Sequence, residues 1–522
     1  MASPNVKLAT SLQKLHDLQQ QGRVVVRTSD LSRTHLERLV ANARLRLIVR
    51  GWYMPSRPEE DMGDTTTWFA SMRHFVRGYC DERFGSNWYV NAELSLKLQT
   101  GSSTLPRQIQ VNALKGTNNA LTLPAGTSMF DLRVREMPSA DQIVQAQGLR
   151  TLSLEAALVR ATPNVWQSDT LTMQLALGML KDASTLNRIL LNGDHTTIAG
   201  RLAGALRAVD RVELADNVLK TMRSAGHTIV EQNPFEAPVQ SARSLPESPY
   251  CARIKAMWEM MREQVLQAWT TQVRPQGSPK DYLDEAEVRY LADAYHSLSI
   301  EGYQVTPEMI DRVRKGTWET GNTERDRHER NAMAAKGYFE AHMAVRASLL
   351  KVLEGENPGT RLRADLQDWY LALWSPSVQV GLLQPSELAG WRGSQVFIKN
   401  ARHTPLPPEA VRDAMPLLFA LLEAETEPCV RAVLGHFVFV FIHPYMDGNG
   451  RLARFIMNLM LATGGWPWTV VTMDIREEYM RALDAASSDQ DIKPFARLLS
   501  SLVQAQLIEG PGRPTATRAF PG

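Results

Sequence analysis

The sequence has few of the features that mark a secreted, membrane-bound or zinc-structured protein. Its 522 residues include three cysteines, Cys80, Cys251 and Cys429, which are far apart and odd in number. This pattern argues against a disulfide framework and against a structural zinc site. There is no run of 18 apolar residues, and the N-terminus lacks the basic-then-apolar pattern of a signal peptide. We therefore expect a cytoplasmic protein without membrane segments, whose thiols are reduced and buried.

The chain also lacks a strong excess of charge of one sign. Its net charge of +2 gives no general attraction to a polyanion. The charge is distributed unevenly along the chain. Residues 1–57 contain ten Lys and Arg and three acidic residues, which gives +7 there and leaves −5 for the remainder. With 44% hydrophobic residues, the chain can fill two or three domain cores.

Residues 1–60 are predicted to form a small winged-helix-like domain. Leucines at helical spacing predict a helix over residues 8–21. Ser29 and Ser32 are typical starts of two further short helices, the second over residues 33–42, and residues 45–54 alternate around a glycine as a hairpin would. This layout weakly resembles the winged-helix head of bacterial antitoxins and is compatible with DNA binding. A small interaction domain with a solvated basic face is the alternative.

Residues 61–232 contain no catalytic constellation and are predicted to form a mixed α/β accessory domain. The expected strands are residues 87–90, 107–111 and 129–134, and the expected helices are residues 152–160, 170–179 and 197–209. Two proline-containing stretches then follow, and we interpret residues 233–249 as a Pro-rich linker between domains.

Residues 250–508 are predicted to be mainly helical. Thr306 and Pro307 are a helix N-cap followed by proline at the first helical position. A glycine-flanked β pattern at residues 390–400 interrupts the helices and predicts a hairpin. Residues 509–522 are rich in Pro, Gly, Thr and Arg and are expected to be a disordered tail. The helices are expected at residues 250–270, 285–299, 307–315, 325–354, 363–373, 409–423, 430–442, 452–463 and 476–488.

The most informative stretch is HPYMDGNGRLAR, which runs from His443 to Arg454 between two strongly apolar segments. Both flanks are predicted to be buried helices, so the polar residues lie in a tight loop that opens the second helix. Its two glycines allow backbone N–H groups to turn inward, and a helix N-terminus favours an anion. Arg451 and Arg454 are three residues apart and project from one side of that helix.

The residue types in this loop suit nucleotide transfer. Asp447 is a hard oxygen ligand for a phosphate-bridging Mg²⁺. His443 can accept a proton near neutral pH. Each residue alone has an ordinary structural interpretation, such as a packed histidine or a turn, but together they describe a base, a metal ligand and an anion cradle. The stretch is neither a GxxxxGK[ST] phosphate loop nor an HExxH zinc site.

At these residues the chain resembles the Fic family, whose signature is HPFx[D/E]GNGRxxR, with Tyr445 in place of the family's Phe. The resemblance implies a helical core with a β-hairpin flap, and transfer of AMP from ATP to a Ser, Thr or Tyr hydroxyl of a target protein with Mg²⁺. It implies that His443 is catalytic. The nucleotide-binding residues it implies are Asp447, Gly448, Asn449, Gly450, Arg451, Leu452, Ala453 and Arg454.

Further sites follow from the same resemblance. The predicted hairpin matches the family's flap, which aligns the target by strand addition. The segment after residue 476 matches the one against which the adenine lies, so Tyr479 could stack on the base and Ser487 could contact the adenosine. The additional nucleotide-binding residues are therefore Val396, Phe397, Ile398, Lys399, Tyr479, Met480 and Ser487.

An inhibitory helix is implied at about residues 285–302. Residues 297–302 (SLSIEG) resemble the family's inhibitory motif [S/T]xxxE[G/N], which places Ser297 and Glu301 in inhibitory positions. The glutamate is expected to pair with Arg454 and to exclude the γ-phosphate. In some relatives the same glutamate assists the removal of AMP, so both directions stay open.

Two other classes of function remain as alternatives. One is transfer from a different donor, such as UTP or a phosphocholine compound, or a kinase reaction on the same scaffold. The other is a DNA-binding regulator or toxin–antitoxin-type module whose Fic domain uses another nucleotide or acts as a sensor. The sequence leaves open whether the protein forms a homo-oligomer. The predicted class is mainly α: an all-helical Fic core with a β-hairpin flap, preceded by a winged-helix-like head and a mixed α/β accessory domain.

Overall fold

The chain folds into two compact units. The computed structural model describes residues 4–58, 65–235, 248–274, 277–317, 325–384, 388 and 390–509. The first unit comprises Met1–Arg253 with Phe397–Thr404, and the second comprises Ile254–Val396 with Pro405–Gly522. Most of the predicted linker and the predicted tail lie outside the described residues, and the division falls at Arg253, just after that linker.

The N-terminal part of the first unit is a helix, a short strand, a second helix and a hairpin. Its core is a small cluster of leucines and Val26. Ser32 caps the second helix by accepting from the N–H of His35. The first of the two short helices predicted here is wrong: residues 28–30 form a turn, because the Asp30 carboxylate accepts from the N–H of Arg27 (2.8 Å). The elements are α1 (Pro4–Gln20), β1 (Val26–Arg27), α2 (Arg33–Ala41), β2 (Leu45–Val49) and β3 (Trp52–Pro55), with the antiparallel sheet order β1-β3-β2.

A four-stranded sheet follows, in the order β4-β5-β7-β6, with β5 and β7 parallel and the other pairs antiparallel. The predicted strands correspond to β4, β5 and β7. The edge strand β6 was missed because its residues are largely exposed and show no alternation of apolar and polar residues. The elements are α3 (Thr66–Phe84), β4 (Trp88–Val90), α4 (Ala92–Gln99), β5 (Gln108–Ala113), β6 (Asn119–Thr122), β7 (Ser128–Arg133), η1 (Ala140–Gln142), β8 (Ile143–Ala146) and β9 (Leu149–Leu152).

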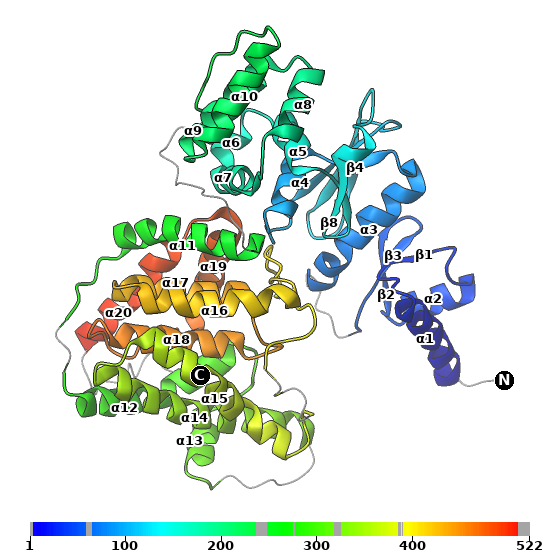
Figure 1. Ribbon diagram of the computed structural model, residues 1–522. Coiled ribbons are helices and arrows are strands. Elements are labelled where there is room, and N and C mark those ends of the chain that lie inside the picture. The colour runs from blue at the N-terminus through cyan, green and yellow to red at the C-terminus, as the bar shows by residue number, and fades with distance from the viewer. Residues whose placement is uncertain are drawn as a thin grey trace. The chain divides into compact units, whose positions relative to one another are not determined.

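Helices complete the first unit around a core of their own, in which Trp166 and Leu206 are buried. The three helices predicted in this region correspond to α5, α7 and α9. The others were missed from the sequence, among them the amphipathic helices α8 and α10. The elements are α5 (Leu154–Arg160), α6 (Val165–Ser168), α7 (Thr170–Met179), α8 (Ser184–Asn192), α9 (Thr196–Ala208) and α10 (Val212–Ser224) (Figure 1).

The predicted flap does not form a hairpin. Residues 395–398 have no strand partner among the described residues, and a turn follows at residues 399–400. Residues 402–404 instead pair with residues 103–105 inside the first unit. There Leu105 N–H donates to Arg402 O (3.1 Å), Thr404 N–H donates to Ser103 O (2.9 Å), and Ser103 Oγ lies 2.9 Å from His403 Nδ1. An isolated hairpin is marginally stable, so these backbone groups take the partner that is available.

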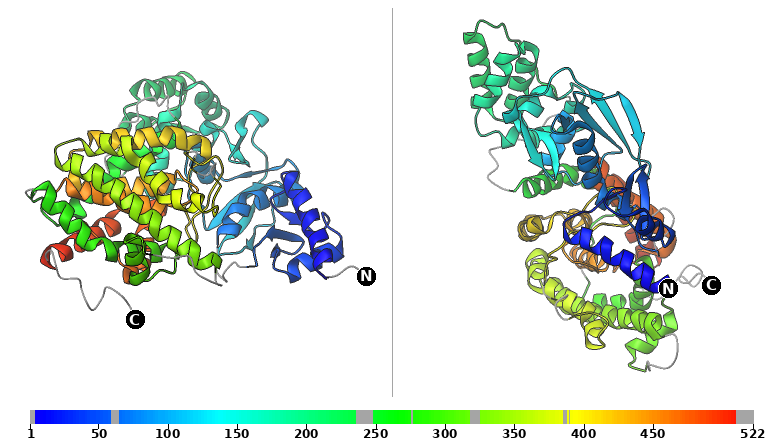
Figure 2. Two further views of the ribbon diagram at one scale, coloured as in Figure 1. Left: turned by 90° about the horizontal axis from the view of Figure 1, so that it is seen from below. Right: turned by 90° about the vertical axis from the view of Figure 1, so that its right-hand side faces the viewer.

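The second unit is a bundle of helices that lie side by side (Figures 1 and 2). The strongly apolar α17 and α18 pack against each other and are almost fully buried, with α14, α15 and α16 as neighbours. The prediction of a mainly α protein is confirmed. Among the described residues, no helix combines the length and apolarity needed to cross a membrane. The elements are α11 (Pro249–Ala268), α12 (Pro279–Ile300), α13 (Pro307–Arg314), α14 (Arg325–Leu353), α15 (Pro358–Gln379), α16 (Pro408–Ala424), α17 (Pro428–Ile442), α18 (Asn449–Ala462), η3 (Met473–Ile475), α19 (Arg476–Asp489) and α20 (Lys493–Glu509).

Candidate active site

His443 is held at the C-cap of α17 in a left-handed backbone conformation. Its φ of 54° and ψ of 62° are unusual for a residue with a side chain, and such positions cost about 1–3 kcal/mol. The N–H of His443 donates to Phe439 O (2.9 Å), so the helix end itself fixes this geometry. The strain is retained at the one residue predicted to be catalytic.

The His443 ring is arranged to act as a base. Its Nδ1 lies 3.2 Å from Val440 O, and since a carbonyl can only accept, Nδ1 carries the proton and Nε2 is left as the acceptor. Burial lowers the pKa of His443 to about 4, although the Val440 carbonyl raises it. The imidazole is therefore neutral at physiological pH.

The loop between α17 and α18 is closed by side chains. Asn449 Oδ1 accepts from Tyr445 N–H (3.0 Å) and its Nδ2 donates to Tyr445 O (2.8 Å), so this side chain is used within the loop. The Tyr445 ring is fully buried and stacks on Tyr370 with 3.8 Å between centroids. Its hydroxyl lies 3.3 Å from Gln367 Oε1, which explains how tyrosine is accommodated at this position.

The start of α18 presents an anion cradle. Gly448 has a φ of 86°, which favours glycine, and its N–H donates to Asp447 Oδ1 (2.5 Å). The next three N–H groups, of residues 449–451, have no acceptor within the described part of the chain. A Cβ added at Gly450 would lie 2.2 Å from Glu301 Oε1, so a carboxylate oxygen rests directly on this turn.

Arg454 is buried and bound by the end of α12. Its Nε donates to Ser297 Oγ (2.8 Å), and its Nη2 donates to Ser297 O (3.0 Å) and to Glu301 Oε1 (2.8 Å). Burial alone would raise the pKa of Glu301, but Arg454 and Arg451 outweigh it and hold that pKa below its ordinary value. The structure therefore places Ser297 and Glu301 on the arginine that the inhibitory motif implies.

Arg451 has a different environment. Its side chain is fully buried, yet none of its three nitrogens forms a hydrogen bond with a described residue. Nη2 lies 3.7 Å from Asp447 Oδ1, beyond hydrogen-bond distance. A buried guanidinium whose N–H groups lack hydrogen-bond acceptors is costly unless an anion satisfies them. Arg451 is therefore a candidate ligand for a phosphate.

Asp447 projects toward solvent, and its side chain is 56% exposed. It lines a cavity of about 320 Å³ together with Glu301, Tyr303 and Arg330. Mg²⁺ in phosphate-transfer sites is held by one or two carboxylates, with phosphate and water oxygens completing its coordination. A single accessible carboxylate next to an anion cradle fits this kind of ion.

Arg392 is a residue that the sequence reasoning missed. Its buried guanidinium donates to His443 O (2.8 Å), Ser394 O (2.8 Å) and Leu406 O, and its backbone N–H donates to Pro444 O (2.9 Å). Burial lowers its pKa to about 10. It ties the loop that carries His443 to the start of the predicted flap. Only its position inside a glycine-flanked pattern signalled it.

Two residues predicted in the nucleotide loop have core positions instead. Leu452 and Ala453 are fully buried, and the Leu452 N–H donates to Gly448 O (3.0 Å) within the first turn of α18. Their packing supports the helix. Of the predicted flap residues, Val396 belongs to the second unit together with the cradle, whereas Phe397, Ile398 and Lys399 belong to the first unit.

The predicted adenine contacts lie on α19. The Tyr479 ring is buried against His436 and Phe495, and its hydroxyl lies 2.7 Å from His436 Nε2. Tyr479 is only 2% exposed, so in this conformation its ring does not offer an open surface for a base. Met480 and Ser487 are half-buried, and Ser487 Oγ donates to Leu483 O (2.8 Å).

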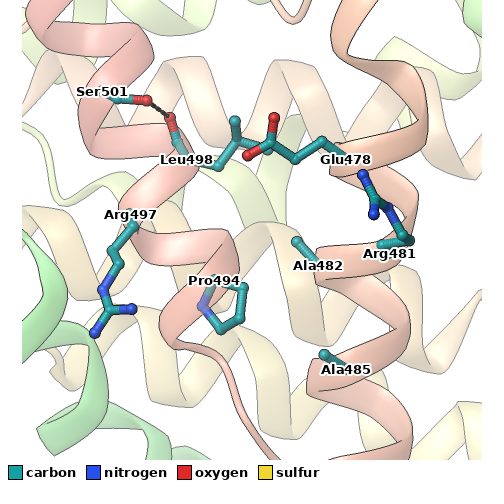
Figure 3. Close-up of a pocket in the computed structure, with 8 residues that line it drawn as sticks. All are labelled: Glu478, Arg481, Ala482, Ala485, Pro494, Arg497, Leu498 and Ser501. Carbon is teal, nitrogen blue, oxygen red and sulfur yellow. Dashed lines mark hydrogen bonds between the residues drawn. The ribbon is translucent and has the colours of Figure 1, made fainter.

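A larger cavity, of about 590 Å³, lies between α19 and α20 (Figure 3). It contains none of the predicted site residues. A choice of the binding site by cavity volume alone would therefore miss the anion cradle. Its lining residues are Glu478, Arg481, Ala482, Ala485, Pro494, Arg497, Leu498 and Ser501.

Comparison with known proteins identifies the class. Residues 376–461 match the model of the Fic/DOC family, so the chain contains a Fic domain and the resemblance seen in the signature is confirmed. The protein adenylyltransferase fic-1 of Caenorhabditis elegans is 32% identical over 132 residues, which are 24% of this chain and 25% of that protein. The protein adenylyltransferase Fic of Nematostella vectensis is 35% identical over 125 residues, 23% of this chain and 29% of that protein.

The match is longer in other relatives. The protein adenylyltransferase Fic of Drosophila grimshawi is 28% identical over 222 residues, which are 42% of each chain. The chain thus spans between a quarter and two fifths of the length of these curated relatives. A solved structure of Fic-1 residues 134–508 from C. elegans has a TM-score of 0.35 at 19% identity, covering 67% of this chain and 88% of that one.

Proposed function

We propose that the protein is an adenylyltransferase that moves AMP from ATP to a Ser, Thr or Tyr hydroxyl of a target protein, and that Glu301 inhibits it in the present conformation. The observation that carries this proposal is a carboxylate in an anion cradle: Glu301 Oε1 lies against Gly450 and binds Arg454. A carboxylate there stands where a phosphate would be satisfied by the same groups. The names of the relatives support AMP as the transferred group.

The residues assign the steps of the reaction. The open N–H groups of residues 449–451 and the guanidinium of Arg451 hold the phosphates of ATP. His443 Nε2 takes the proton of the target hydroxyl as its oxygen attacks the α-phosphorus. The bond from the α-phosphorus to the bridging oxygen breaks, and pyrophosphate leaves with its growing charge next to the arginines. His443 later releases its proton to solvent.

Asp447 would hold Mg²⁺ together with the phosphates. When bound, this ion neutralises phosphate charge and orients the triphosphate. The Glu301 carboxylate opposes binding of the nucleotide in two ways, because it repels the phosphates and occupies Arg454. Its removal should therefore increase transfer rather than abolish it.

Intact-mass measurement after incubation with ATP and Mg²⁺ tests this function. The wild type is expected to gain little mass, and Glu301→Gly is expected to gain one or more AMP groups by auto-modification, at least about tenfold faster. The double variant Glu301→Gly/His443→Ala should lose this gain by about 100- to 10,000-fold, the usual contribution of a general base.

The mass shift separates the donors that the sequence left open. Addition of a phosphate or of UMP would show a kinase or another nucleotide donor, and no addition in Glu301→Gly would contradict transfer. Unchanged modification in the double variant would remove His443 from the mechanism. The thermal melting of each variant shows whether a variant that has lost activity is still folded.

Two further expectations stay proposals. A sensor-only Fic domain is not favoured, because the relatives are named as enzymes. DNA binding by residues 1–60 rests on α2, the β2–β3 hairpin and the local charge of +7. The cysteines Cys80, Cys251 and Cys429 are buried and form no disulfide among the described residues, which suits a reducing compartment such as the cytoplasm.

A further inference from the structure

The guanidinium of Arg451 contacts two aromatic rings. Its Cζ is 4.7 Å from the centroid of the Trp374 ring and 5.1 Å from that of the Tyr303 ring. Both rings are at least nine-tenths buried, so these contacts act where water does not screen them. Contacts of this kind use the faces of the guanidinium and leave its in-plane N–H groups free. This agrees with the absence of hydrogen bonds to the described residues.

We infer that Trp374 and Tyr303 form an aromatic clamp that positions Arg451 for the phosphates of the nucleotide. The inference rests on the proposed function and deepens it, because it assigns two positioning residues outside the signature. Neither ring needs to touch the substrate. The clamp fixes the desolvated Arg451 side chain while its N–H donors have no acceptors. The side chain therefore loses less conformational entropy when ATP binds.

The clamp is connected to the loop that carries the cradle. Trp374 lies on α15, and a Cβ added at Gly448 would be 3.0 Å from Trp374 Nε1 and 3.0 Å from Leu373 Cδ2. Glycine at this position therefore lets the loop approach the tryptophan closely. On the other ring, Arg330 Cζ lies 5.8 Å from the Tyr303 centroid and lines the same 320 Å³ cavity.

Tyr303 and Glu301 belong to one turn but act on different arginines. The end of α12 is fixed by Gly302 N–H donating to Ser299 O (3.0 Å) and Tyr303 N–H donating to Leu298 O (3.1 Å). Glu301 occupies Arg454, whereas Tyr303 supports Arg451. Unfolding this turn would free one arginine and release the other from its clamp.

Binding of ATP to Glu301→Gly variants tests the clamp, with Kd measured by calorimetry in the presence of Mg²⁺ and KM and kcat measured by AMP transfer. Adding Tyr303→Ala is expected to raise Kd and KM by about 5- to 30-fold, the range for a desolvated cation–π contact, with a smaller change in kcat. Adding Tyr303→Phe should restore both to within about twofold, since the ring is kept.

Control variants separate the clamp from general stability. Phe419→Ala removes another ring from another arginine in the same unit, since Arg363 Cζ lies 5.5 Å from Phe419, and it should leave Kd unchanged. If Tyr303→Ala does not fold, Tyr303→Leu fills the volume without a π face and should weaken binding equally. Unchanged Kd in Tyr303→Ala or Tyr303→Leu, or an equal loss in Tyr303→Phe, would overturn the clamp.

The measurements distinguish failure of the clamp from failure of the proposed function. If Glu301→Gly transfers AMP and the Tyr303 variants bind ATP unchanged, only the clamp is wrong. If Glu301→Gly transfers no AMP, the proposed function is wrong. In that case the Kd values for ATP still show whether Tyr303 supports Arg451.

Discussion

Arg451 and Arg454 lie three residues apart on one helix and are both buried, but their hydrogen bonding differs. Arg454 donates three hydrogen bonds to Ser297 and Glu301, whereas Arg451 donates none to the described residues and is held by ring faces. Protein groups have already replaced the anion at one arginine. Arg451 keeps its N–H donors without acceptors. The packing of the surrounding residues offsets the free-energy cost of burying them.

Under the proposed function, this difference would leave the nucleotide site half closed. The carboxylate at Arg454 would keep the terminal phosphate out, while Arg451 would remain available to the phosphates nearer the reacting bond. Inhibition of this kind would not require disorder in the loop that carries His443. Removing one side chain should be enough to open a site whose remaining parts are in place.

Replacing each arginine by methionine is the strongest way to break the comparison. Arg454→Met leaves Glu301 partly buried without its partner and should lower the free energy of unfolding by about 3–5 kcal/mol. Arg451→Met removes a buried cation that has no hydrogen bonds. The loss in the free energy of unfolding should therefore be at least about 2 kcal/mol smaller than in Arg454→Met. In the Glu301→Gly background, Arg451→Met should also reduce AMP transfer by about 100- to 1000-fold.

Thermal and urea unfolding without nucleotide measure the first effect, and AMP transfer measures the second. Equal destabilisation by the two substitutions would show that the arginines are not in different states. Retained transfer by Glu301→Gly/Arg451→Met would show that Arg451 does not bind the reacting phosphates.

A smaller change tests how the closed side is held. Ser297→Ala removes the acceptor of Arg454 Nε but leaves the Ser297 carbonyl and Glu301 in place. Losing one such bond is worth about 1 kcal/mol, so basal AMP transfer should rise about fivefold. Ser299→Ala on the same helix is the matched control and should change transfer little. A rise that is equal in both variants would point to the helix rather than to the hydrogen bond.

The smallest expected effect concerns pH. Arg454 and Arg451 hold the pKa of Glu301 below its ordinary value, so its carboxylate stays ionised and the pairing is lost only as pH falls through that lowered pKa. The pKa of His443 is about 4, so the base stays neutral over the same range. The ratio of AMP transfer by Glu301→Gly to that by wild type should change less than about twofold between about pH 5.5 and 8.

Parallel pH profiles of the two proteins check this expectation. Activation of the wild type near about pH 6 would mean that the carboxylate is protonated far above the expected range. A loss of transfer by Glu301→Gly of about tenfold at about pH 5.5 would mean that His443 titrates near 6.5, as an unperturbed imidazole does.

The helix–loop–helix around His443 could be predicted from the sequence because its signals are local. Apolar runs, a glycine-containing turn and charged residues at fixed spacing specify it within about 35 residues. The pairing of Arg454 with Glu301 followed from a motif as well. The strand positions β4, β5 and β7 were also recovered from local signals, and β5 shows a clear alternation of apolar and polar residues.

What could not be predicted depends on packing between distant segments. Arg392 reaches a carbonyl 51 residues away, and Trp374 and Tyr303 meet Arg451 from two other parts of the chain. A ring in a helical sequence looks like a core residue whether or not it touches a cation. The hairpin predicted at residues 390–400 was wrong: residues 395–398 have no strand partner among the described residues, and residues 402–404, just beyond the predicted hairpin, pair with residues 103–105.

The pairing of residues 402–404 with residues 103–105 has a practical consequence. The first unit includes a segment from far downstream, so it is not one continuous stretch of the sequence. A fragment ending at Arg253 would lack that peptide and leave the backbone of Ser103 and Leu105 bare. A fragment starting at Ile254 would contain residues 402–404 without residues 103–105, with which they pair. Fragments of this protein should therefore be produced and studied together.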